Sequence, residues 1–242
     1  HIHLVGVGGA GMSAIARVLL GRGFVVSGSD MSANDYTAVL AQEGATIHQG
    51  HAASQISGAD ALVISSAIPD SNHEESAAKA ANVPVLKRAD FLGHLMQGSL
   101  GIGVAGSHGK TTTTGMIAHI FSEAGLDPTV ILGGTLPSLG TNGRSGSGDH
   151  FIIEADEYDH MFLGLRPQYA VVTNVEHDHP DIYPTWDDYL AAFRQFLELL
   201  PENGRFVACA DDKGVAELLR QAPLTMEQVI TYGTSPKTAQ LT

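Results

Sequence analysis

Residues 101–114, GIGVAGSHGKTTTT, run from a short apolar stretch into a glycine-rich loop. The loop ends in Gly109, Lys110 and Thr111, which match the end of the G-x-x-x-x-G-K-[ST] pattern of nucleoside triphosphate sites. The first glycine of that pattern is missing, because position 104 is Val104. We expect backbone N–H groups of the loop to face the β- and γ-phosphates, Lys110 to bridge them and the Thr111 hydroxyl to ligate Mg²⁺. The predicted ATP-binding residues are Gly106, Ser107, His108, Gly109, Lys110, Thr111 and Thr112.

Two later apolar stretches end in side chains that can bind a cation. Glu154 follows FII at 151–153, and a carboxylate with the Thr111 hydroxyl would suit a hard cation near phosphate oxygens. The sequence His177-Asp178-His179 has a spacing that suggests zinc, but no cysteine or third clustered histidine completes a tetrahedral set. We therefore expect one imidazole to join oxygen ligands on a second Mg²⁺.

A second glycine-rich turn lies near the start of the chain. Residues 6–11, GVGGAG, fit the G-x-G-x-x-G pattern between a strand and a helix, and Asp30 ends the next apolar stretch. An acidic residue at about this spacing binds a ribose in dinucleotide sites. A dinucleotide and a UDP-sugar both contain a ribose and a pyrophosphate, so the pattern leaves the ligand open. A tight turn without a ligand is the alternative.

Apolar strands alternate with amphipathic helices along the chain. This pattern predicts βαβ units and parallel sheets, an α/β fold class. It restarts near residue 98, and we place a domain boundary at about residue 99. After the apolar stretch 128–134 we expect a loop of about 15 residues rich in Gly, Ser and Asn. The expected strands fall within 1–7, 24–30, 61–67, 83–88, 101–105, 128–134, 151–159, 169–179, 205–212 and 228–233.

Composition excludes several classes of function. The formal net charge of −13 disfavours nucleic acid as the main partner. No apolar run approaches the roughly 20 residues that span a bilayer, and no signal peptide opens the chain, which disfavours a membrane partner. The single cysteine, Cys209, fits a cytoplasmic protein. Because the chain begins at His1 without an initiator methionine, we expect it to be part of a longer protein.

The motifs GVGGAGMS, GSD, SSAIP, GSHGKTTTT, EADEYD and TNVEHDHPD, in this order, resemble the Mur ligases of peptidoglycan synthesis over essentially the whole chain. The resemblance implies a Rossmann-like, parallel-sheet UDP-binding domain at 1–98 and a P-loop-type α/β ATPase domain at 99–242. It also implies that ATP, with Mg²⁺, phosphorylates the lactyl carboxylate of UDP-N-acetylmuramate. The amine of L-alanine then attacks the acyl phosphate to form an amide. The family member that recycles tripeptide is the alternative, because Tyr158 is more typical of it.

The same resemblance assigns roles to single residues. It implies that Lys110, Glu154 and His179 are catalytic and that Thr111, Glu154 and His179 bind metal. The implied UDP-sugar-binding residues are Gly8, Gly9, Ala10, Gly11, Asp30, Ser65, Ala67 and Arg88. Some Mur ligases carry a carbamoylated lysine on the helix after the histidine, where this chain has Arg194 and no lysine.

Three further expectations complete the sequence analysis. The family's adenine-binding segment and amino-acid-binding domain find no match here, so we expect the 242-residue chain not to form the amide by itself. An NAD-dependent oxidoreductase would use the first glycine turn and Asp30, but it would leave Lys110, Glu154 and His179 without a role. A regulatory nucleotide-binding module without a catalytic partner is the third reading.

Overall fold

The structure is a computed structural model that describes residues 1–137, 139–234 and 240. It divides into two compact units. The first unit comprises 1–91 and 127–148, and the second comprises 92–126 and 149–242. The expected boundary near residue 99 therefore differs from this division at two places, because residues 92–98 group with the second unit and 127–148 with the first. The described residues contain no helix that is long and apolar enough to cross a bilayer.

The first unit is built on a five-stranded parallel sheet in the order β3-β2-β1-β4-β5. Buried apolar side chains of β1 and β4 form the core of the sheet, together with the buried face of α1. The strands are β1 (Ile2–Val5), β2 (Val26–Asp30), β3 (Thr46–Gln49), β4 (Ala61–Ile64) and β5 (Val85–Lys87). The helices are α1 (Ala10–Gly21), α2 (Asp35–Gln42), α3 (His73–Ala80) and the start of α4 (Arg88–Leu95), with a short 3-10 helix at Ala53–Ile56.

An antiparallel hairpin from later in the chain completes the first unit. Strand β7 (Thr129–Leu136) pairs with β8 (Thr141–Arg144), and both pack against α1. The expected long loop after residue 134 is therefore wrong. This segment, although rich in glycine and asparagine, contains the strand β8. The buried side chain of Asn142 in this strand donates hydrogen bonds to the Ala10 carbonyl at 2.7 Å and to Ser13 Oγ at 2.9 Å. Arg17 also donates to Asn142 Oδ1, at 2.6 Å.

A buried polar network links β1, β2 and α3. Glu74 of α3 is fully buried and lies 3.0 Å from His3 Nε2. Ser29 Oγ donates to the same carboxylate at 2.7 Å, and His51 Nδ1 lies 2.8 Å from it. Burial raises the pKa of Glu74, but the side-chain hydrogen bonds from His3, Ser29 and His51 outweigh that effect and lower it. The carboxylate is therefore ionised inside the sheet-helix core.

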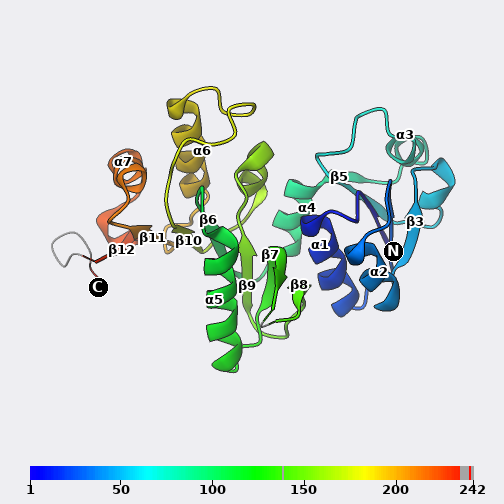
Figure 1. Ribbon diagram of the computed structural model, residues 1–242, viewed down its shortest axis with the longest axis horizontal. Helices are drawn as coiled ribbons and strands as arrows, with labels where there is room; N and C mark the ends of the chain where they lie inside the picture. The colour runs from blue at the N-terminus through cyan, green and yellow to red at the C-terminus, as the bar shows by residue number, and fades with distance from the viewer. Residues whose placement is uncertain (138, 235–239, 241–242) are drawn as a thin grey trace. The chain divides into compact units, whose positions relative to one another are not determined.

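The second unit contains five parallel strands in the order β12-β11-β10-β6-β9. These are β6 (Leu100–Ala105), β9 (His150–Glu154), β10 (Tyr169–Val172), β11 (Arg205–Cys209) and β12 (Val229–Tyr232). The helices are α5 (Lys110–Glu123), α6 (Trp186–Glu198) and α7 (Lys213–Gln221), with short 3-10 helices at Tyr158–Gly164 and Met226–Gln228. Figure 1 shows this alternation of strands and helices by colour. The expected α/β class with parallel sheets is confirmed.

Side chains cap the N-termini of α6 and α7. The Thr185 hydroxyl accepts from the Asp188 N–H at the start of α6, and Asp212 accepts from the Val215 N–H at the start of α7. Such caps satisfy N–H groups that lack a partner within the helix. In contrast, α1 and α5 begin after Gly9 and Gly109, which supply no side-chain cap. These are the two helices that follow the glycine loops.

Candidate functional site

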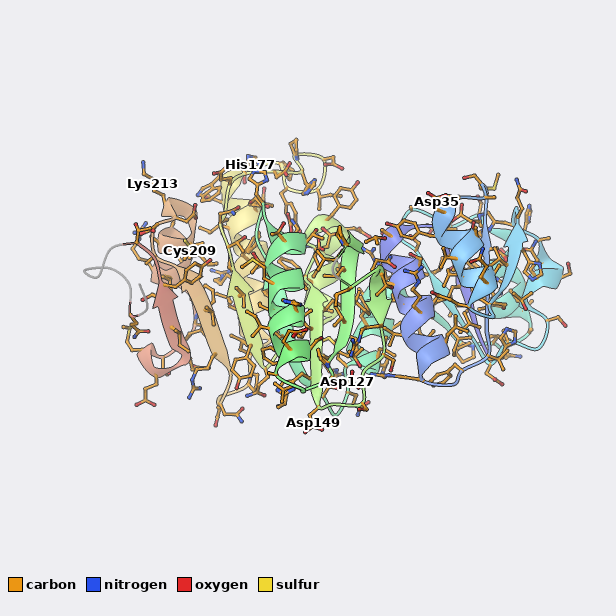
Figure 2. The ribbon with its side chains drawn as sticks, turned by 60° about the horizontal axis from the view of Figure 1, so that its bottom comes forward. Asp35, Asp127, Asp149, His177, Cys209 and Lys213 are labelled. Carbon is orange, nitrogen blue, oxygen red and sulfur yellow. The ribbon has the colours of Figure 1, made fainter. Side chains whose placement is uncertain are left out.

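Both glycine loops follow a strand at which the order of the sheet reverses. Strand β1 lies between β2 and β4, and β6 lies between β10 and β9. In open α/β sheets, ligands bind beyond the carboxyl ends of the strands at such points. In Figure 2, His177 and Lys213, which follow β10 and β11, lie at one end of the second unit, and Asp149, which precedes β9, lies at the other. The residues after β6, β9 and β10 therefore gather at one edge.

The loop before α5 depends on two glycines. Gly106 has φ +135° and Gly109 has φ +80°, both in the region that favours glycine. A Cβ atom at Gly106 would lie 2.2 Å from Thr173 Oγ1, so no larger residue fits there. Because Gly109 offers no capping side chain, the first N–H groups of α5 suit an anion.

The segment after β10 holds this loop in shape. The His108 N–H donates to Asn174 Oδ1 at 2.9 Å, and Thr173 Oγ1 donates back to the His108 carbonyl at 2.7 Å. Ser107 Oγ donates to the Glu176 carbonyl at 2.7 Å and accepts from the Glu176 N–H at 2.8 Å. Residues 173–176 are therefore part of the site. In the sequence, residues 173–176 stand out only as part of the strand expected at 169–179 and of the motif TNVEHDHPD.

Lys110 is paired with a carboxylate that the sequence analysis did not single out. Its Nζ donates to the Gly106 carbonyl at 2.7 Å and to Glu157 Oε1 at 2.9 Å, with a longer contact of 3.4 Å to the Ser107 carbonyl. The same nitrogen lies 2.9 Å from Glu157 Oε2, without the angles of a hydrogen bond. Glu157 is fully buried although it belongs to the acidic run EADEYD. Its burial could not be read from a run of four acidic side chains.

Two tyrosines fix Glu157. Tyr189 Oη of α6 donates to its Oε1 at 3.2 Å, and the Tyr183 hydroxyl donates to its backbone carbonyl. Burial is the largest cause that raises the pKa of Tyr189, so its phenol is protonated near neutral pH and acts as a donor. Tyr189 also lies within hydrogen-bond distance of Ser107 Oγ, at 2.9 Å. One helix therefore contacts both the glycine loop and the partner of Lys110.

Thr111 and Glu154 are brought together as expected. Thr111 Oγ1 donates to Glu154 Oε1 at 3.0 Å, although the two residues lie 43 positions apart in the chain. A hydroxyl beside a carboxylate is a set of oxygen donors that fits Mg²⁺. Within the described part of the chain, no group of three or more His, Cys, Asp or Glu side chains is arranged to hold a metal. A cation here would need the hydroxyl and phosphate oxygens as well.

His179 lies on the same edge, next to Glu157. Its Nε2 is 3.7 Å from Glu157 Oε1, and its ring packs edge-on against Tyr158 at 5.0 Å between centroids. The residue has φ +54°, a conformation that is uncommon outside glycine. The His179 ring therefore lies beside Glu157, Tyr158 and Asp178, whose Oδ2 is 3.8 Å from its Nε2. The side chain of His177 contacts the Tyr183 carbonyl at 2.8 Å, which leaves His179 as the imidazole of this pair beside Glu157.

The predicted residues of the first unit also converge. The Gly8 N–H donates to Asp30 Oδ2 at 2.9 Å, which places Asp30 beside the glycine turn. A Cβ atom at Gly11 would lie 2.7 Å from Arg88 Nη1, so Arg88 lies against the start of α1. A Cβ atom at Gly6 would meet Ser65 at 3.1 Å, which places Ser65 beside the same turn, and the Ala67 N–H donates to Ser65 Oγ at 3.4 Å. This unit thus combines a helix start that has no side-chain cap with an acid and a guanidinium.

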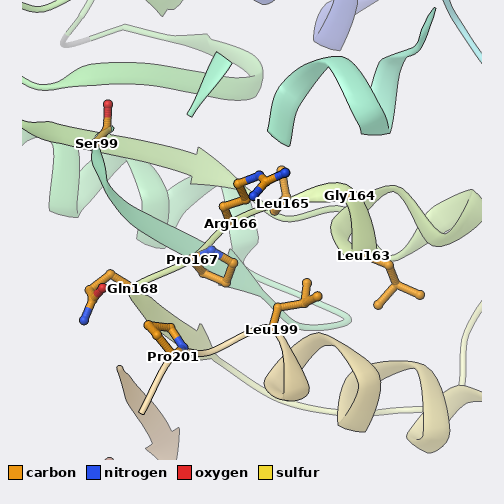
Figure 3. Close-up of a pocket in the computed structure, with 9 residues that line it drawn as sticks. All are labelled: Ser99, Leu163, Gly164, Leu165, Arg166, Pro167, Gln168, Leu199 and Pro201. Atoms are coloured by element: carbon orange, nitrogen blue, oxygen red, sulfur yellow. The ribbon is translucent and has the colours of Figure 1, made fainter. Parts of the chain in front are cut away.

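A cleft of about 440 Å³ lies at the other edge of the second unit. Ser99 precedes β6 and Gln168 precedes β10, so the cleft opens at the amino ends of the strands (Figure 3). Its other lining residues are Leu163, Gly164, Leu165, Arg166, Pro167, Leu199 and Pro201. No predicted site residue belongs to this cleft.

Two family models match the chain. Residues 1–99 match the model of the Mur ligase family, catalytic domain, and residues 104–242 match that of the Mur ligase middle domain. A UDP-N-acetylmuramate–L-alanine ligase of Thiobacillus denitrificans is 49% identical over 98% of this chain and 50% of its own length. The same enzyme of Salinibacter ruber is 46% identical over 97% of this chain and 49% of its own length. The chain spans about half the length of the curated relatives it matches.

Solved structures give the same fold. The UDP-N-acetylmuramate:L-alanyl-γ-D-glutamyl-meso-diaminopimelate ligase of Neisseria meningitides superposes with a TM-score of 0.87 at 29% identity, over 96% of this chain and 77% of that one. The UDP-N-acetylmuramate-alanine ligase of Thermotoga maritima superposes with a TM-score of 0.81 at 31% identity, over 97% of this chain and 52% of that one.

Proposed function

Because the chain belongs to the Mur ligase family, we propose that it is the part of an ADP-forming ligase that binds a UDP-sugar and ATP, and that the ligase joins L-alanine to UDP-N-acetylmuramate. The observation that supports this most is the pairing of Thr111 with Glu154 beside Lys110 at the carboxyl edge of a parallel sheet. The choice of amino acid rests on the 46–49% identity to enzymes that carry this name. As a peptidoglycan precursor ligase it would act in the cytoplasm.

The residues of the second unit would neutralise charge and position the reactants. Lys110 and the N–H groups of residues 106–112 would bind the β- and γ-phosphates of ATP. Thr111 and Glu154 would hold one Mg²⁺ and His179 a second, and the bound Mg²⁺ would neutralise phosphate charge. A carboxylate and a triphosphate repel each other, so holding both in reach of one another supplies much of the acceleration. The lactyl carboxylate of the UDP-sugar would attack the γ-phosphorus and release ADP, which gives an acyl phosphate. The amine of L-alanine would then attack the acyl carbon and release inorganic phosphate, which leaves the amide.

The residues of the first unit would bind the UDP-sugar. The glycine turn of Gly8 to Gly11 would lie against the pyrophosphate, and the N–H groups at the start of α1 would bind it. Arg88 lies against Gly11 and would add a positive charge there. Asp30, Ser65 and Ala67 would line the ribose or sugar, since they lie at the ends of β2 and β4.

The test is an assay of the full-length protein that contains this chain. It is supplied with UDP-N-acetylmuramate, ATP and Mg²⁺, and in turn with each of a panel of amino acids and the L-alanyl-γ-D-glutamyl-meso-diaminopimelate tripeptide. We expect ADP and an amide product with L-alanine. A product with the tripeptide alone would make the protein a recycling ligase, and a response to NADH without a response to UDP-N-acetylmuramate would favour an oxidoreductase. The 242-residue chain alone is expected to give no amide, and amide formation by it would contradict that expectation.

A further inference from the structure

We propose that Glu157 is a positioning residue that holds the Lys110 ammonium toward the triphosphate. This inference rests on the proposed function, because it concerns the lysine of the ATP loop. Lys110 Nζ has three hydrogens and three acceptors, namely the carbonyls of Gly106 and Ser107 and Glu157 Oε1. Two of these acceptors belong to the lysine's own loop. Glu157 is the acceptor that comes from another part of the sheet edge.

The position of each acceptor in the chain decides whether it can fix the Lys110 ammonium relative to the rest of the site. The carbonyls of Gly106 and Ser107 precede the lysine by four and three residues, so they move with the loop. Glu157 follows β9, the strand that pairs with β6 in parallel. A lysine side chain has four flexible carbons and no fixed direction of its own. An anchor on the neighbouring strand end gives the ammonium a defined place relative to Thr111 and Glu154.

The carboxylate is itself held in place. Glu157 is fully buried, and the side chain of Lys110 is 13% exposed. The Tyr189 hydroxyl donates to Glu157 Oε1, and the Tyr183 hydroxyl donates to its carbonyl. A buried charge that loses its partner is strongly unfavourable, so each member of the pair requires the other. The structure thus has a rigid anion that determines where the cation lies.

The direction in which ATP affinity changes when the charge of Glu157 is removed distinguishes a positioning role from simple charge repulsion. A carboxylate near a triphosphate repels it, so removing the charge should tighten ATP binding if Glu157 does nothing else. If Glu157 positions Lys110, removing its charge should weaken ATP binding instead. The two outcomes have opposite directions.

The experiment compares Glu157→Gln with the wild type in the full-length protein that contains this chain, using the dissociation constant of Mg-ATP from titration calorimetry. Glu157→Gln keeps the size of the side chain and an oxygen acceptor. We expect affinity to fall by at least about fivefold, because a charge-assisted bond becomes a neutral one. The matched control is Glu198→Gln on α6, an exposed glutamate paired with Arg194, which should stay within about twofold. Equal or tighter binding by Glu157→Gln would overturn the proposal.

A double-mutant cycle tests whether Glu157 acts through the lysine. Lys110→Met leaves the buried carboxylate without its partner, so the midpoint of thermal unfolding should fall. Adding Glu157→Gln should raise that midpoint again, whereas the same change in the wild-type chain should lower it. A Glu157→Gln effect of the same sign and size in both backgrounds would show that Glu157 works independently of Lys110. Tyr189→Phe, which keeps the aromatic ring, should weaken Mg-ATP binding less than Glu157→Gln does.

The outcomes separate this inference from the proposed function. Full-length wild-type protein that does not bind Mg-ATP would overturn the proposed function and the inference with it. A wild-type chain that binds Mg-ATP as tightly as Glu157→Gln would overturn the inference alone.

Discussion

Gly106 is the residue at which the shape of the glycine loop before α5 depends most on the absence of a side chain. It has a positive φ, and the space where a Cβ would lie is occupied by Thr173 Oγ1 at 2.2 Å. The neighbouring strand end therefore approaches the loop closely enough for Thr173 and Asn174 to bond the carbonyl of His108. The requirement for glycine here comes from packing as well as from backbone conformation.

Gly106→Ala should destabilise the chain by about 2–4 kcal/mol, because the new methyl group would displace Thr173 and strain the backbone. Urea unfolding measures the change. Gly134→Ala is the control, since nothing lies within 4 Å of its Cβ position and its φ is not positive, and it should change the free energy by about 1 kcal/mol or less. Equal effects of the two substitutions would contradict this account of the loop.

Thr111→Val should remove most of the advantage that Mg²⁺ gives to ATP binding. Valine keeps the branched shape but lacks the hydroxyl that donates to Glu154. We expect Mg-ATP affinity to fall about tenfold, with little change in the affinity measured in excess chelator. Thr113→Val, on the same helix, is the control. If Thr111→Val responds to Mg²⁺ as the wild-type chain does, the hydroxyl is not a metal ligand.

At the scale of elements, the buried network of Glu74 ties β1 and β2 to α3. Glu74 has a lowered pKa in the folded chain and an ordinary value of 4.5. A lowered pKa stabilises the fold at pH values above the ordinary value, and this stabilisation is lost as the pH falls through the folded value. The network therefore stabilises the fold at neutral pH, and this stabilisation is lost in acid.

Glu74→Gln should lower the free energy of unfolding by about 1–3 kcal/mol at pH 7, because buried hydrogen bonds to a charged group are replaced. The difference from the wild-type chain should shrink below pH 4.5. Urea unfolding at pH 7, 5, 4 and 3 measures it. Glu75→Gln, whose side chain bonds the exposed Lys79, should remove less of the acid dependence. A difference that is constant with pH would contradict the ionised state of Glu74.

The elements that the sequence predicts are those with a strong periodic pattern. The apolar strands β1, β6 and β9 and the amphipathic helix α6 are present where the sequence places them. Strand β3 was not predicted, because Thr46–Gln49 lies at the sheet edge and has no apolar alternation. The residues of strand β8, TNGR, have the composition of a loop, and the strand is held by the hydrogen bonds of Asn142 and by packing on α1.

In the candidate site, too, the residues that a local sequence pattern identifies differ from those whose role depends on contacts with distant parts of the chain. The glycine loops, Asp30 and Glu154 could be found because each follows directly on an apolar strand. Glu157 could not be distinguished from its acidic neighbours, since its burial depends on Tyr183 and Tyr189 from later in the chain. Contacts between residues far apart in the chain cannot be predicted from the local pattern of residue types.

At the scale of the whole molecule, the first unit is not continuous in sequence. Residues 127–148 return to it, and Asn142 bonds the Ala10 carbonyl beside the first glycine turn. The family models divide the chain near residue 100, as a continuous reading of the sequence does. A piece cut at that point lacks the hairpin that covers α1.

Residues 1–98 expressed alone should therefore unfold at a lower temperature than the first unit does in the intact chain, with α1 exchanging its amide hydrogens faster. Removing the hairpin exposes apolar side chains of α1 and leaves the Ala10 carbonyl without Asn142. Hydrogen exchange of α1 in the two chains measures the difference. Equal protection of α1 in both would show that the hairpin does not stabilise this unit.

The interruption also sets an order of events during synthesis. A ribosome makes the strands β1 to β5 first, yet the last two strands of that unit emerge only after α5 has been translated. Proteins generally fold from the N-terminus as they are made. Here β1 to β5 must wait, with one face of α1 uncovered, until the glycine loop before α5 has left the ribosome and β7 and β8 have followed it.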